Sequence, residues 1–104
     1  MRSIRDYERR PIRLTEERLI HILEHPEMKG MVPKIEETIQ HPSKVIQSKS
    51  DLRARLYYRF YFGTLVGDKY LCVVVKFGMR DAFILTAYFT DSIKKGDSVW
   101  PKKQ

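Results

Sequence analysis

Three runs of alternating side chains occupy about half of the second half of this 104-residue chain. They cover residues 55–62, 69–77 and 82–89, and only short segments containing glycine and aspartate separate them. A period of two residues is typical of β-strands, and turns this short usually join antiparallel neighbours. The sequence therefore predicts an antiparallel meander. The chain is too short for two independent domains, a TIM barrel or a doubly wound dinucleotide fold.

Two amphipathic helices are expected before these strands. The first covers residues 15–25: the side chain of Thr15 can cap a free backbone N–H, and Pro26 limits the helix at its C-terminal end. The second covers residues 31–40 and has Pro33 in its first turn, a position that proline favours.

The remaining segments complete the expected fold. Residues 1–11 are polar and rich in arginine, which fits a flexible arm, and residues 45–47 fit a short extended segment. The expected fold class is α+β: two N-terminal helices packed on a four-stranded (or so) antiparallel meander sheet. Residues 1–104 would then form a single domain.

Positive charge is concentrated after residue 40. Twenty Lys and Arg residues against 13 Asp and Glu give a net charge of +7 and a pI near 9.7. Residues 21–40 are net negative, whereas residues 41–62 and 63–104 are both net positive. Such an excess indicates a polyanionic partner, either nucleic acid or an acidic lipid surface, although solubility alone also explains it.

The single cysteine and the apolar segments exclude other classes of protein. Cys72 alone can form neither an internal disulfide nor a multi-cysteine zinc site, and its apolar surroundings indicate a core position. The charged N-terminus leads into no apolar signal segment, and no run approaches the roughly 20 apolar residues of a membrane helix. We therefore expect a cytoplasmic protein with no membrane partner.

Two histidines in the first expected helix are candidates for chemistry. His21 and His25 are four residues apart, so an unbroken helix would bring them together one turn apart, beside Arg18 and opposite the apolar side. Imidazoles titrate near neutral pH and can serve as general base and general acid. The run lacks the glutamate of an HExxH zinc site, although the spacing itself could hold a metal. Two solvated surface histidines are the simplest alternative.

The first strand offers a candidate binding surface. Arg55, Tyr57, Arg59 and Tyr61 alternate with apolar residues and would share one face. Guanidinium groups bind phosphate and aromatic rings stack on unpaired bases, so this face is typical of nucleic-acid contact. An ordinary amphipathic outer face with aromatic residues is the alternative.

The two later strands can add to that surface. Lys76 follows three consecutive valines, and burying its charge would be costly, so we expect it to open onto a cleft. An ordinary lysine at a strand end remains the alternative. Thr86 and Tyr88 are placed on the third strand, where the same face could include them.

Several of these segments together resemble a known family. They are the run from His21 to Met28, Tyr57-Tyr58-Arg59, the run from Tyr70 to Lys76, and Ile84-Leu85-Thr86-Ala87-Tyr88. In combination they resemble the phage-associated nucleases of the barnase, EndoU, colicin and RelE-like superfamily, over about residues 12–101.

The resemblance implies a toxin-like, metal-independent endoribonuclease that uses no cofactor. In that chemistry the ribose 2′-hydroxyl attacks the adjacent phosphate. By position, His21 and His25 would be the acid and base, Arg59 and Lys76 would hold the phosphate, and Thr86 and Tyr88 would orient it. The implied partners are RNA, with tRNA or mRNA as plausible substrates, and an acidic antitoxin or immunity protein. Because some relatives with the RelE-like fold are not nucleases and bind protein targets instead, a non-catalytic RNA- or protein-binding module of the same fold is the alternative.

Overall fold

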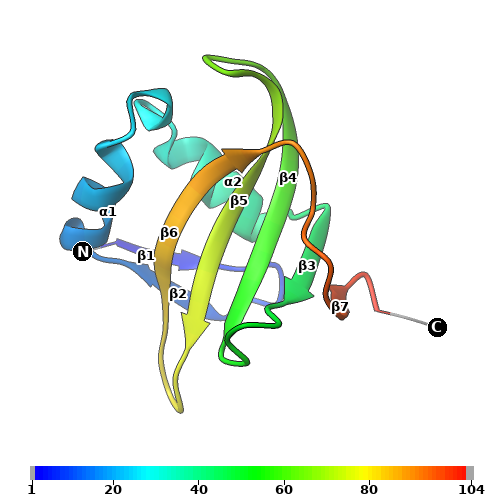
Figure 1. The fold of residues 1–104 in the computed structure, drawn as a ribbon. Coiled ribbons are helices and arrows are strands. Elements are labelled where there is room, and N and C mark those ends of the chain that lie inside the picture. The colour runs from blue at the N-terminus through cyan, green and yellow to red at the C-terminus, as the bar shows by residue number, and fades with distance from the viewer. Residues whose placement is uncertain (1, 103–104) are drawn as a thin grey trace.

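One seven-stranded sheet organises the chain, of which the computed structural model describes residues 2–102 (Figure 1). The order of strands across the sheet is β1-β2-β6-β5-β4-β3-β7. The strands are β1 (Arg2–Arg5), β2 (Pro11–Leu14), β3 (Lys44–Gln47), β4 (Ala54–Thr64), β5 (Gly67–Phe77), β6 (Ala82–Thr90) and β7 (Ser98–Trp100). The helices are α1 (Glu16–Leu23) and α2 (Val32–Gln40), with a short 3-10 turn, η1 (Pro26–Met28), between them.

The expected four-stranded antiparallel sheet is wrong in both strand number and strand direction. The three long strands β4, β5 and β6 do pair in antiparallel order, with Cys72 opposite both Tyr58 and Tyr88. However, β2 pairs with β6 in parallel, through Arg13 and Phe83, so the sheet is mixed. The four additional strands have only three or four residues each, which is too short for an alternating pattern to stand out in the sequence.

The expected flexible arm at residues 1–11 is wrong as well. β1 and β2 form an antiparallel hairpin in which Ile4 lies opposite Ile12. Both side chains are buried in the main core, together with Leu14. These few apolar residues are enough to attach the N-terminal segment to the sheet, because each one is removed from water almost completely.

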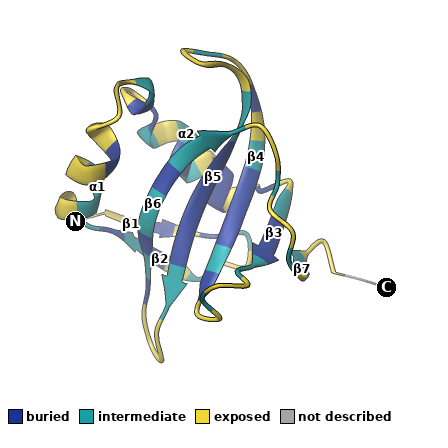
Figure 2. Ribbon diagram, viewed as in Figure 1, coloured by how far each residue is buried: buried dark blue, intermediate teal, exposed yellow. Residues whose placement is uncertain are grey.

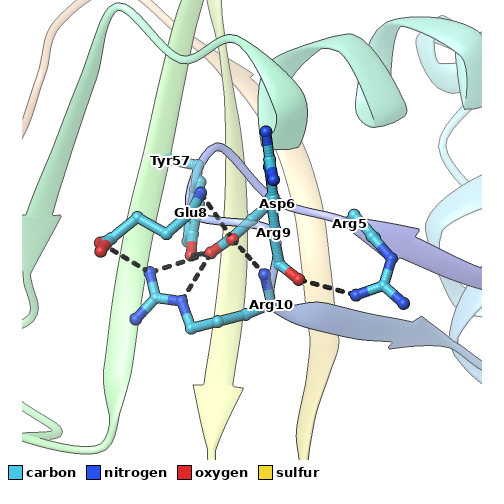
Figure 3. A network of polar contacts seen from close by, with 6 residues as sticks. All are labelled: Arg5, Asp6, Glu8, Arg9, Arg10 and Tyr57. Carbon is cyan, nitrogen blue, oxygen red and sulfur yellow. Dashed lines mark hydrogen bonds and ion pairs between the residues drawn. The ribbon is translucent and has the colours of Figure 1, made fainter.

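A buried carboxylate holds the turn between β1 and β2 (Figure 3). The side chain of Asp6 is fully buried, and it accepts hydrogen bonds from the backbone N–H groups of Glu8 and Arg10, each 2.9 Å long. It also forms an ion pair with the Arg10 guanidinium at 2.9 Å. The hydroxyl of Tyr57 in β4 donates to Asp6 Oδ2 at 2.8 Å. The network therefore joins the N-terminal hairpin to the centre of the sheet.

Both helices lie on one face of the sheet, α1 against β6 and α2 against β4 and β5. The hydroxyl of Thr15 caps α1 by accepting the N–H of Arg18 at 3.2 Å, as the sequence predicted. The helix nevertheless ends at Leu23, before the predicted residue 25, and His25 has an extended backbone just before Pro26. The predicted end of this helix at residue 25 is therefore wrong by two residues.

The two faces of the sheet are covered in different ways. The helices cover the main core on one face. The opposite face, called here the open face, carries a smaller core that includes Leu56, Tyr58, Cys72 and Val74. After β6, residues 91–97 cross this face toward β7, and they are called here the crossing segment (Figure 1). Its Ile93 packs on the smaller core.

A glycine lets the crossing segment approach β3 closely. A Cβ on Gly96 would lie 2.6 Å from the backbone oxygen of Gln47, which is shorter than any ordinary contact. The backbone N–H of Gln47 in turn donates to the carbonyl of Asp97 at 2.9 Å. This contact fixes the position of the segment and of the two lysines that precede Gly96.

Candidate functional site

The expected binding surface on β4 lies under the helices. Tyr57 is fully buried and Tyr61 is 8% exposed, and both belong to the main core. Their hydroxyls have partners inside the protein: Tyr57 bonds to Asp6, and Tyr61 donates to Glu37 Oε1 at 2.7 Å. Burial is the main reason that the pKa of Tyr57 is raised and that the pKa of Tyr61 is raised to about 12. The expectation that both tyrosines face a ligand is wrong.

The two arginines of that strand are also engaged. The Arg59 guanidinium donates to the carbonyl of His41 at 2.6 Å and lies 3.5 Å from Glu37 Oε1. The Arg55 guanidinium carbon lies 5.0 Å from the centre of the Phe77 ring, a cation–π contact. Both arginines therefore support the helix-covered side of the fold. Sequence alternation alone could not show this, because it does not tell which face the helices cover.

A groove rich in lysine lies on the open face instead. Its volume is about 340 Å³. It is called here the lysine groove and is lined by Ser48, Lys49, Ser50, Asp51, Ala54, Leu56, Val74, Leu85, Tyr88, Lys94 and Lys95. The floor is aliphatic and comes from the three central strands, whereas the charged rim comes from the β3–β4 loop and the crossing segment. Lys49, Lys94 and Lys95 are all exposed, so the rim is available to an anion.

Three residues predicted from the sequence lie on this face. Tyr88 lines the groove, and Thr86 lies opposite Val74 of its floor. Lys76 forms an ion pair with Asp51 of its rim. The hydrogen bond from Lys76 lowers the pKa of Asp51, so this carboxylate stays charged and the pair counts as neutral at the rim.

His25 lines a second pocket, of about 360 Å³, called here the His25 pocket. Its other lining residues are Glu27, Val66, Lys69, Tyr88, Phe89, Thr90 and Asp91. His25 Nδ1 lies 3.7 Å from Glu27 Oε1. Lys69 forms an ion pair with Asp91. Tyr88 lines both this pocket and the lysine groove, so the two are adjacent.

The four expected catalytic residues do not share one site. Lys76 lies opposite Phe83 near the start of β6, whereas the His25 pocket includes Phe89 near its end. Six strand residues separate the two positions by about 20 Å. His21 is exposed on α1, where its Nδ1 lies 3.5 Å from Glu24 Oε1. The structure therefore brings His25 close to Tyr88 and leaves His21 and Lys76 elsewhere.

Sequence reasoning missed four lysines of these pockets. Lys94 and Lys95 were visible as a basic pair before Gly96, but only the crossing segment explains why they reach the sheet. The backbone N–H of Lys94 donates to the Tyr58 hydroxyl at 3.2 Å, which fixes that residue on the open face. Lys49 lies in the polar loop between β3 and β4, and Lys69 lies in β5 close to the β4–β5 turn. No sequence pattern distinguished either residue.

Cys72 is confirmed as a core residue. It is fully buried in the smaller core, and burial raises the pKa of its thiol. The thiol therefore stays protonated near neutral pH and is a poor nucleophile.

The described residues contain no metal-binding cluster and no membrane-spanning helix, and the chain matches no known protein in the comparisons. Within residues 2–102, no group of three or more His, Cys, Asp or Glu side chains is arranged to hold a metal ion. Neither α1 nor α2, the α-helices of that range, has the length and apolar character needed to cross a membrane. Family models, curated proteins and solved structures were all compared with this chain, and none of them matches it.

Proposed function

We propose that this domain is a metal-independent endoribonuclease that binds RNA along the open face and cleaves it at the His25 pocket. The observation that carries the proposal is the position of Tyr88, which lines both the lysine groove and the His25 pocket. A polyanion lying in the groove would reach an imidazole at its end. This is also the chemistry implied by the resemblance to the barnase, EndoU, colicin and RelE-like nucleases.

The binding step follows from the charges around the groove. Lys49, Lys94 and Lys95 have exposed ammonium groups, and the one carboxylate of the groove, Asp51, is paired with Lys76. The lining therefore has an unbalanced positive charge, which favours phosphate groups and releases counterions when they bind. The aliphatic floor below it gives the sugar and base a dry surface.

The cleavage step uses the side chains of the His25 pocket. The 2′-hydroxyl attacks the adjacent phosphate, so that a bond from O2′ to phosphorus forms and the bond to O5′ breaks. The imidazole of His25 takes the proton of the 2′-hydroxyl, and the ammonium of Lys69 gives a proton to the leaving O5′. Burial raises the pKa of Tyr88, so its phenol stays neutral and donates a hydrogen bond to a phosphoryl oxygen.

The test of the cleavage step is the requirement for the 2′-hydroxyl. We expect the protein to cleave an RNA oligonucleotide in the presence of EDTA and to leave a 2′,3′-cyclic phosphate end. The same sequence with 2′-O-methyl ribose should bind but remain intact, because it has no nucleophile. Products are resolved by gel electrophoresis and mass spectrometry. Cleavage of the 2′-O-methyl strand, or cleavage only with added metal, would contradict the proposed mechanism.

The binding step predicts a change in salt dependence. Replacing both Lys94 and Lys95 with glutamine should weaken binding of the 2′-O-methyl strand and reduce the slope of log K against log salt by about 1.4, at about 0.7 per phosphate contact. The matched control is Lys34→Gln on α2, on the helix-covered face, which should leave the slope unchanged. Fluorescence anisotropy over a salt series measures the affinity and the slope. Equal slopes for the wild type, the double lysine variant and Lys34→Gln would show that RNA binds outside the lysine groove.

A non-catalytic binding module is the second candidate. The observation that favours it is the separation of His21 and Lys76 from the His25 pocket, which leaves one histidine where the resemblance implied two. In that case the wild-type protein would bind both oligonucleotides through the lysine groove and cleave neither.

A further inference from the structure

Three aromatic rings cover the open face between the crossing segment and the end of the β4–β5 hairpin. They belong to Phe60, Phe62 and Tyr70 and are called here the aromatic platform. Phe60 lies directly opposite Tyr70 in the sheet, and their ring centroids are 4.9 Å apart at an interplanar angle of 79°. The Phe62 ring follows at 5.1 Å from Phe60 and 75°. These edge-to-face contacts hold the three rings in a fixed arrangement.

Two of the three rings are exposed although they are large and apolar. Phe62 is 77% exposed and Phe60 is 38% exposed. Figure 2 shows the contrast along β4, which is buried at its centre and exposed toward this hairpin. Leaving such rings in water opposes folding, and no described segment covers them, so a ligand that covers them would gain apolar contact.

The platform continues directly from the lysine groove. The Tyr70 ring lies 6.2 Å from that of Tyr58, and the Tyr58 hydroxyl accepts the backbone N–H of Lys94. Lys94 itself lines the groove. Cations and exposed aromatic rings are therefore neighbours on one face of the sheet, an arrangement that fits a ligand with anionic and aromatic parts.

We propose that the aromatic platform stacks unpaired bases of the bound RNA, so that the ligand of the open face is single-stranded RNA. The inference rests on the proposed function and specifies its substrate. Bases in a duplex are paired and stacked on one another, and their faces cannot reach a side chain. A single strand can place its phosphates at Lys94 and Lys95 and turn its bases onto Phe60 and Phe62. Because every base has an aromatic face, this contact would tolerate many sequences.

The test compares a single strand with a duplex. Fluorescence anisotropy would measure binding of a labelled 2′-O-methyl single strand and of a 2′-O-methyl duplex of equal length. We expect the wild type to prefer the single strand, and Phe62→Ala to weaken that binding about 5- to 150-fold, the range for loss of one stacked base. Phe62→Tyr should retain the affinity because it keeps the ring. The control Met79→Ala removes a fully exposed apolar side chain from the β5–β6 turn and should change nothing.

The outcomes separate this inference from the proposed function. Equal affinity of the wild type for the single strand and the duplex, with no effect of Phe62→Ala, would overturn base stacking on the aromatic platform and leave RNA binding in place. No binding of either ligand would overturn both. Size-exclusion chromatography gives a further check: a wild-type dimer that Phe62→Ala converts to a monomer would show that a second copy covers the platform, and this too would overturn the inference.

Discussion

Replacing His25 with alanine is expected to lower the rate of RNA cleavage by about 10²- to 10⁴-fold, the usual contribution of a general base. The imidazole is the group of the His25 pocket that can accept a proton from the 2′-hydroxyl at neutral pH. Affinity for the 2′-O-methyl strand should change little, because the lysines provide most of the binding. Initial rates on a labelled RNA measure the effect.

His21→Ala is the matched control for this prediction. His21 has the same side chain, is four residues earlier, and is similarly exposed beside a glutamate. It lies outside the His25 pocket, so its loss should change the rate less than threefold or so. Equal losses in the two variants, or activity retained by His25→Ala, would contradict the role of His25. Circular dichroism of both variants would establish that each is folded.

Asp6→Ala is expected to lower the free energy of unfolding by about 3 kcal/mol. The substitution removes the partner of Arg10 and leaves the buried hydroxyl of Tyr57 without an acceptor. It also removes the acceptor of two backbone N–H groups in the turn between β1 and β2. A small domain is stable by only about 5–15 kcal/mol, so the effect should be large in urea denaturation.

Two further variants make this second prediction specific. Glu8→Ala removes the other carboxylate near Arg10. Because the Glu8 side chain is half exposed, this substitution should lower the free energy of unfolding by less than about 1 kcal/mol. Tyr57→Phe removes one hydrogen bond and should cost about 1 kcal/mol, and it remains measurable even if Asp6→Ala does not fold. Equal costs for Asp6→Ala and Glu8→Ala would show that the buried network does not stabilise the hairpin.

The long strands and the starts of the helices could be predicted because their signals are local. Alternation over eight or more residues marked β4, β5 and β6, and Thr15 marked the start of α1. Of the short strands, β3 was expected as an extended segment at residues 45–47. β1 could not be predicted, because it depends on one buried residue, Ile4, and on a partner strand.

The candidate site was harder to predict because it depends on which face of each strand is covered. Tyr57 and Tyr61 have the same sequence pattern as ligand-binding tyrosines, but acceptors on distant segments, Asp6 and Glu37, let them enter the core. Conversely, Phe60 and Phe62 have a core-like pattern and are exposed. Burial here is set by the helices and the crossing segment, whose positions are tertiary properties.

The crossing segment also has a consequence for synthesis. The β3–β4 loop and strands β4 to β6 leave the ribosome before residues 91–97. A nascent chain that has emerged as far as Thr90 has the floor of the lysine groove but lacks Lys94 and Lys95, and its smaller core has no cover. The lysine groove is therefore complete only after residues 91–97 have docked on the open face, so the RNA binding proposed above would require the finished C-terminal segment.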